Sequence, residues 1–128
     1  MGYVLLVEDD VDSAEVVTTF LERSGHHVDL AADGKRALAL MATGRPDVVV
    51  LDLNVPGLDG IGFLRVLQSC FRDSEPQVIV LSGMPDGPKL RRASELGVRR
   101  MFRKAEYQLS DLLACINECC EPEPVSWW

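Results

Sequence analysis

The chain lacks several features that would place it in particular classes of protein. No apolar run approaches the roughly 18 residues of a membrane span, and the start Met1-Gly2-Tyr3 leads into a strand-like segment without a signal peptide. Its four cysteines form no disulfide-rich framework, which predicts a reducing, cytoplasmic location. Positive charge is scarce: 13 Lys and Arg stand against 20 Asp and Glu, and the net charge of −7 argues against general binding to nucleic acids or acidic membranes.

The scarce positive charge is concentrated in one part of the chain. Seven of the 13 Lys and Arg residues lie between Lys89 and Lys104, where Glu95 is the only acidic residue. A solvated helix and strand edge is the simpler interpretation of this segment. A docking face for an acidic partner is the alternative.

Apolar runs alternate with segments of helical period along the chain. Near-continuous apolar runs are typical of strands that are covered on both faces. The last strand candidate is the weakest, because three arginines interrupt it. The predicted strands are 3–7, 27–31, 48–52, 78–82 and 99–103.

Helices are predicted between and after these strands. The first begins near Asp12, whose spacing to Glu15 resembles a capping box, and ends at Gly25. The second ends at Gly44 and the fourth at Gly97. The third and fifth are recognised by apolar residues at helical spacing, which are Ile61, Leu64 and Leu67 in the third and Leu109, Leu112, Leu113 and Ile116 in the fifth.

Strict alternation of five strands with five helices predicts an α/β fold, a parallel sheet with helices on both faces. The length of 128 residues favours one domain, which we expect to span residues 1–120. Two prolines, Pro122 and Pro124, end the last helix, and we expect the tail 121–128 to be mobile.

Acidic residues follow two of the apolar runs directly. Asp52 ends the run 48–51, and Glu8, Asp9 and Asp10 follow the run 3–7. In open α/β sheets, ligands bind at the carboxyl ends of the strands. If the two strands are neighbours, their carboxylates meet in one pocket, where they shift their pKa values or hold a hard cation.

Four separated motifs, each at a strand end, resemble one family closely. These are Leu5-Leu6-Val7-Glu8-Asp9-Asp10, Asp52-Leu53-Asn54-Val55-Pro56-Gly57-Leu58-Asp59-Gly60, Val80-Leu81-Ser82-Gly83 and Arg103-Lys104. Together they resemble the receiver domain of two-component response regulators, over residues 3 to about 120. The resemblance implies a flavodoxin-like, doubly wound five-stranded sheet of strand order 2-1-3-4-5.

The resemblance also implies a role for each acidic residue. Asp52 matches the phosphoacceptor, Asp9 the acid that binds Mg²⁺, and Glu8 the acid that reaches the metal through water. The backbone carbonyl of Asn54 matches a third protein ligand. Oxygen ligands of this kind suit Mg²⁺, which keeps several of its waters.

Residues at the end of the fourth predicted strand, within the fifth and directly after the fifth complete the implied site. Ser82 matches the hydroxyl that bonds the phosphoryl oxygen, and Lys104 the cation that pairs with the acceptor. Met101 stands where the family commonly has the aromatic residue that moves with Ser82 in the switch. Ala105 replaces the usual proline after the lysine, so the bond before it is expected to be trans or noticeably strained. Asn54 and Met84 are expected to flank the path of the water that hydrolyses the phosphoryl group.

The predicted function is therefore a phosphoacceptor receiver in a two-component phosphorelay, and not an enzyme beyond weak self-catalysed transfer and autodephosphorylation. The expected partners are a sensor histidine kinase or histidine phosphotransfer protein and a downstream protein at the fourth helix, fifth strand and fifth helix. Direct nucleic-acid and membrane contacts are not expected. A haloacid-dehalogenase-like phosphohydrolase and a phosphorylation-independent interaction module remain alternatives. Either a stand-alone receiver or the N-terminal part of a longer protein fits the chain.

Overall fold

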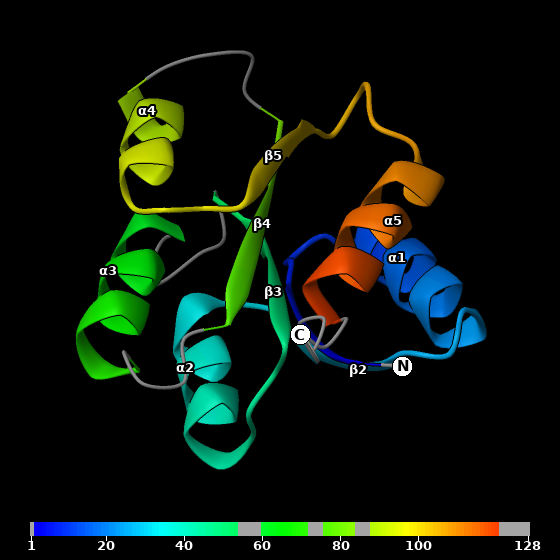
Figure 1. Cartoon of the computed structure of the whole chain (residues 1–128), viewed down its shortest axis with the longest axis horizontal. Helices are drawn as coiled ribbons and strands as arrows, with labels where there is room; N and C mark the ends of the chain where they lie inside the picture. Colours follow the sequence, from blue (N-terminus) through cyan, green and yellow to red (C-terminus); the bar gives the residue numbers. More distant parts are fainter. Residues whose placement is uncertain (1, 54–59, 72–75, 84–87, 121–128) are drawn as a thin grey trace, which may run out of the picture.

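The structure, a computed structural model, describes residues 2–53, 60–71, 76–83 and 88–120. Across these ranges, parallel strands alternate with helices and form one sheet of order β2-β1-β3-β4-β5 (Figure 1). This confirms the predicted fold class and strand order. The elements are β1 (Tyr3–Val7), α1 (Val11–Arg23), β2 (His27–Ala31), α2 (Gly34–Thr43), β3 (Val48–Asp52), α3 (Gly60–Cys70), β4 (Gln77–Ser82), α4 (Pro88–Glu95), β5 (Arg100–Arg103) and α5 (Leu109–Cys120).

Helices cover both faces of the sheet. Figure 1 shows α2, α3 and α4 on one face and α1 and α5 on the other. The central strands β1, β3 and β4 are nearly fully buried, because each presents alternate side chains to two helical layers. No helix in the described part of the chain is long and apolar enough to cross a membrane.

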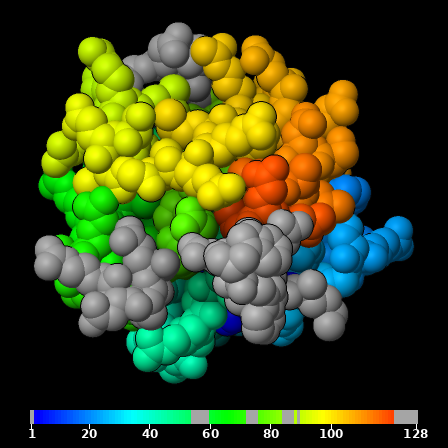
Figure 2. Space-filling view, viewed as in Figure 1, coloured from blue at the N-terminus to red at the C-terminus, as the bar shows by residue number. Residues whose placement is uncertain are grey.

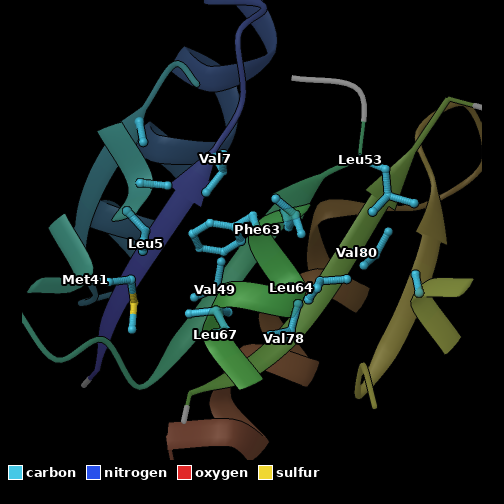
Figure 3. Packing of buried hydrophobic residues seen from close by; sticks show 14 residues of the cluster. Leu5, Val7, Met41, Val49, Leu53, Phe63, Leu64, Leu67, Val78 and Val80 are labelled. Carbon is cyan, nitrogen blue, oxygen red and sulfur yellow. The ribbon is translucent and has the colours of Figure 1, made fainter. Parts of the chain in front are cut away.

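Two hydrophobic clusters hold the layers together, one on each face of the sheet. On the α2–α4 face, the ring of Phe63 packs against the strands close to Val7 and Val49 (Figure 3). On the α1–α5 face, Leu21 and Ile116 are fully buried against the sheet. Each fully buried side chain of this size contributes roughly 1.5–3 kcal/mol relative to an exposed one, so the two clusters fix the sheet between its helices.

Some element boundaries differ from the predicted ones. Helix α1 is capped by Asp10, whose carboxylate accepts hydrogen bonds from the Asp12 N–H and the Ser13 hydroxyl, both at 3.1 Å. The predicted cap at Asp12 is therefore wrong by two residues. Strand β4 begins one residue early, at Gln77, and β5 begins one residue late, at Arg100.

One glycine sits where two segments of the main chain touch. A methyl group added at Gly60 would lie 2.6 Å from the Cα of Leu53, a backbone atom that cannot turn aside. We expect Gly60→Ala to lower the free energy of unfolding by about 1–3 kcal/mol, because a packed core resists added atoms. Gly83→Ala is the matched control, since no atom lies within 4 Å of its added methyl group. Chemical denaturation of both variants checks this, and equal stability would contradict it.

Candidate functional site

The register of the sheet brings the predicted site residues to one edge. Val7 pairs with Leu51, so the next residues along each strand, Glu8 and Asp52, are neighbours. Across the next two strand pairs, Asp52 pairs with Leu81 and Ser82 pairs with Arg103. The predicted site residues at the ends of β1, β3, β4 and β5 therefore meet at the carboxyl edge of the sheet, where open α/β sheets bind ligands.

Three of these side chains also lie on the same face of the sheet. Glu8, Asp52 and Lys104 each stand two residues after a residue of the α1–α5 cluster, and side chains repeat their direction every second residue. Lys104 Nζ donates to Glu8 Oε1 at 2.5 Å and to Asp52 Oδ2 at 3.0 Å. Glu8 is 4% exposed and Asp52 is 6% exposed. One ammonium group therefore holds two buried carboxylates.

The charges in this cluster are out of balance. Burial raises the pKa of the Glu8 carboxyl, and the hydrogen bond from Lys104 offsets this only in part, because the nearby Asp52 raises the pKa further. Burial acts to lower the pKa of Lys104, but its hydrogen bonds to Glu8 and Asp52 outweigh burial and the pKa is raised. Two carboxylates that share one cation leave an excess of negative charge, which favours a second cation.

Asp9 supplies the third carboxylate at this edge. Oxygen atoms of Glu8, Asp9 and Asp52 all lie within 4.8 Å of one another, and Asp9 is exposed while the other two are buried. Carboxylate oxygens with one open side suit Mg²⁺, which takes hard oxygen ligands and keeps several waters. The donors present thus fit the predicted metal. Asp10 is not part of this group, and its carboxylate caps α1.

Ser82 and Met101 lie toward the other helical layer. Ser82 is 1% exposed. It stands two and four residues after Val80 and Val78 of the α2–α4 cluster, so its side chain points to the same face of the sheet. Met101 pairs with Val80 in the register and is 38% exposed. Both residues predicted to take part in a switch therefore share one face, and Met101 has room to change its position.

The peptide bond before Ala105 was predicted to be either trans or noticeably strained. No peptide bond within the described residues is cis, so the bond between Lys104 and Ala105 is trans. Lys104 also donates its backbone N–H to the Ser82 carbonyl at 2.9 Å, which continues the pairing of β4 with β5 beyond the strand ends. This hydrogen bond fixes the backbone from which the Lys104 side chain extends.

Much of the positive charge in the segment 89–104 is paired locally. Arg92 pairs with Glu95, Arg99 with Glu118 and Arg103 with Glu106. The Arg100 guanidinium lies 4.7 Å from the centre of the Phe102 ring. These contacts favour the simpler interpretation of a solvated helix and strand edge.

Two predicted site residues, Asn54 and Met84, lie outside the described residues, so their predicted roles stay predictions. Sequence reasoning paired Lys104 with Asp52 but missed its hydrogen bond to Glu8. The two-residue period of the strands could have predicted this hydrogen bond, because it puts the side chains of Glu8, Asp52 and Lys104 on one face of the sheet.

Solved structures of receiver domains resemble this chain over nearly its full length. The receiver domain of the Francisella response regulator 1452 superposes with a TM-score of 0.83 at 29% identity, covering 93% of this chain and 96% of that one. The chemotaxis response regulator CheY4 of Vibrio cholerae superposes with a TM-score of 0.82 at 25% identity, covering 93% and 98%.

Curated relatives match a smaller part of the chain. The DNA-binding response regulator MtrA of Mycolicibacterium paratuberculosis is 37% identical over 83 residues, which is 65% of this chain and 36% of MtrA. The probable transcriptional regulator ycf27 of Guillardia theta is 37% identical over 94 residues, 73% of this chain and 36% of that protein. The chain thus spans about a third of the length of these relatives.

These relatives correct the prediction that nucleic acid is not a direct partner. MtrA is named as a DNA-binding protein, which contradicts that exclusion. The exclusion rested on a net charge of −7 over this chain. The charge of a part that corresponds to 36% of MtrA cannot exclude nucleic acid as a partner of a whole response regulator.

A family match agrees with these likenesses. The response regulator receiver domain family matches residues 4–117, which includes every described strand end that contributes to the acidic site. The match covers most of the 128 residues. With the strand order and the cluster at the carboxyl edge, it establishes that this chain belongs to the response regulator receiver domain family.

Proposed function

We propose that this domain, residues 1–120, accepts a phosphoryl group on Asp52 from a phosphohistidine donor with the help of Mg²⁺. Phosphorylation then changes a partner-binding surface. The observation that carries the proposal is the buried Asp52 carboxylate, held at 3.0 Å by Lys104 and crowded by Glu8 and Asp9. The donor would be a sensor kinase or a phosphotransfer protein, and the setting is the cytoplasm.

Asp52 is the nucleophile in this proposal. One of its carboxylate oxygens attacks phosphorus and forms a new O–P bond, while the P–N bond to the donor imidazole breaks and the electron pair leaves with nitrogen. A carboxylate can perform this attack when positive groups neutralise the approaching phosphoryl charge. Lys104 supplies such a charge at hydrogen-bond distance from Asp52. Ser82 would bind a phosphoryl oxygen through its hydroxyl.

The metal would be held by Glu8, Asp9, Asp52 and the carbonyl of Asn54. When bound, Mg²⁺ would neutralise charge on the phosphoryl oxygens. Glu8 is hydrogen bonded to Lys104 and to the Asp10 N–H, at 3.3 Å, which suits a carboxylate that acts through water rather than directly. Asp9, which is exposed, can turn its carboxylate toward the ion.

The switch would run from Ser82 to Met101. Both lie on the α2–α4 face, and Met101 is partly exposed beside Val80. If the Ser82 hydroxyl moves toward a phosphoryl group, the flexible thioether of Met101 can fill the space that it leaves. The surface around β5 would change as a result.

The alternatives differ in what they need at Asp52. A haloacid-dehalogenase-like phosphohydrolase needs a second aspartate two residues after the nucleophile, and this chain has Asn54 there. An interaction module that works without phosphorylation does not need Lys104 to be paired with the buried Asp52 carboxylate. Membership of the receiver family favours neither alternative.

One experiment separates the three functions. The protein is incubated with Mg²⁺ and a small phosphoramidate donor, and its intact mass is followed. A long-lived gain of one phosphoryl group supports the receiver. Release of phosphate over many turnovers supports the hydrolase, and an unchanged mass supports the module.

We expect Mg²⁺ to bind with a dissociation constant on the order of millimolar, because it uses few protein ligands in such sites. Asp9→Ala should weaken binding by about tenfold or more, since it removes one of three carboxylates near the ion. Asp12→Ala, a nearby acidic residue of α1 outside the carboxylate group, is the control. Titration followed by NMR measures both. Equal affinity of Asp9→Ala and wild type would exclude Asp9 as a ligand.

A further inference from the structure

The chain turns back tightly just after Lys104. The N–H groups of Glu106 and Tyr107 both donate to the carbonyl of Arg103, at 3.0 and 3.1 Å. This turn carries Tyr107 back toward the end of β5, at the edge of the sheet where the carboxylates gather. Figure 2 shows this part of the chain, between β5 in yellow and α5 in orange and red, at the surface.

The ring of Tyr107 is seated on Phe102. The two ring centres are 5.8 Å apart with planes tilted by 46°, an arrangement that aromatic pairs favour. Phe102 is 8% exposed and belongs to the α1–α5 cluster, against which Tyr107 also packs. Phe102 and Lys104 are two residues apart, so their side chains point to the same face of the sheet. Because Tyr107 packs on Phe102, its ring lies on the face to which the Lys104 side chain also points.

The electrostatics of Tyr107 agree with this placement. Burial raises the pKa of its hydroxyl, the Lys104 ammonium opposes the rise, and the Glu8 carboxylate adds to it. The two charges that act on the pKa of this hydroxyl are thus those of the Lys104–Glu8 pair. Tyr107 has no assigned part in the site described above.

We propose that Tyr107 is a positioning residue, whose ring, anchored on Phe102, fixes the turn after Lys104 and so holds the Lys104 ammonium between Glu8 and Asp52. This inference rests on the proposed function, because the position of Lys104 matters to the transfer of a phosphoryl group to Asp52. The aromatic ring is the part of Tyr107 that acts. The hydroxyl is not required, since no described residue is seen to hydrogen-bond it.

The test uses the full chain with ¹³C-labelled lysine. The sequence has three lysines, Lys35, Lys89 and Lys104, so the ε-carbon signals are few and single substitutions assign them. Tyr107→Ala removes the ring, and Tyr107→Phe keeps it. Tyr3→Ala is the matched control, because Tyr3 forms a similar tilted ring pair, 5.2 Å from His27, at the opposite end of the sheet.

Without Mg²⁺, we expect the Lys104 signal to shift in Tyr107→Ala and to stay in place in Tyr107→Phe and Tyr3→Ala. The initial rate of phosphorylation with Mg²⁺ should fall about tenfold in Tyr107→Ala and stay within about twofold in Tyr107→Phe, because small displacements of a charged group are costly. Thermal melting identifies variants that are merely unstable.

An unmoved Lys104 signal in folded Tyr107→Ala would overturn the proposal. An equal shift in Tyr107→Phe would overturn it as well, because the hydroxyl would then be the acting group. If the wild type takes up no phosphoryl group, the proposed function fails, whereas the NMR comparison still decides whether Tyr107 positions Lys104.

Discussion

Replacement of Asp52 by asparagine should abolish stoichiometric uptake of a phosphoryl group while the protein stays folded. The amide has nearly the shape of the carboxylate but is a far weaker nucleophile, so the attack on phosphorus is lost. The substitution also removes one negative charge from a buried, crowded cluster, which relieves repulsion between Asp52 and Glu8. We therefore expect the free energy of unfolding of the metal-free variant to equal or exceed that of the wild type.

Intact mass after incubation with a phosphodonor and Mg²⁺ measures this effect. Asp47→Asn is the matched control, because Asp47 immediately precedes the same strand, β3, but is exposed and lies at its other end. The control should gain one phosphoryl group, as the wild type does. Full labelling of Asp52→Asn would show that another residue accepts the phosphoryl group.

Replacement of Lys104 by methionine is expected to have the second largest effect. It should lower the rate of phosphorylation by about a hundredfold, because it removes a positioned positive charge that the arriving phosphoryl group needs. It also leaves Glu8 and Asp52 buried together without a cation. Loss of one partner from a buried ion pair costs about 3–5 kcal/mol, but Lys104 is 28% exposed, so we expect about 1–3 kcal/mol in metal-free protein.

Mg²⁺ should bind Lys104→Met more tightly than it binds the wild type, because no ammonium group competes for the same oxygens. Lys35→Met is the control, since Lys35 is an exposed lysine of α2. Single-turnover kinetics at saturating Mg²⁺ and denaturation without Mg²⁺ measure the two effects. If Lys104→Met is phosphorylated at the wild-type rate, Lys104 does not contribute to the reaction.

The strand segments and the position of the site could be predicted from sequence because strong local patterns carry them, whereas the strand order came from the resemblance to receiver domains. The apolar runs at β1, β3 and β4 leave few choices for a buried strand, and acidic residues follow two of them. Parallel strands bring their carboxyl ends to one edge, and Asp9 and Asp52 meet there because β1 and β3 are neighbours in the sheet. Asn54 lies outside the described residues, and its predicted carbonyl ligand remains a prediction.

Features that depend on side-chain geometry were harder to predict. Asp10 and Asp12 are both suitable N-cap residues for α1 by residue type. In the structure, Asp10 has the extended backbone of a cap and accepts the Asp12 N–H, so Asp10 is the N-cap. Tyr107 carries no motif, and its contact with Phe102 arises from a turn that no local pattern announced. The nucleic-acid exclusion was wrong for another reason, because the net charge of one domain does not describe a whole response regulator.

Identification of the residue that carries the phosphoryl group is the sharpest test of Asp52 as the acceptor. An acyl phosphate on aspartate is reduced by borohydride to homoserine, and peptide mass spectrometry then locates the changed residue. The buried Asp52 carboxylate, paired with Lys104 beside two further acids, predicts homoserine at position 52 and nowhere else. Reduction at Asp9 or at any other residue, with Asp52 intact, would contradict it.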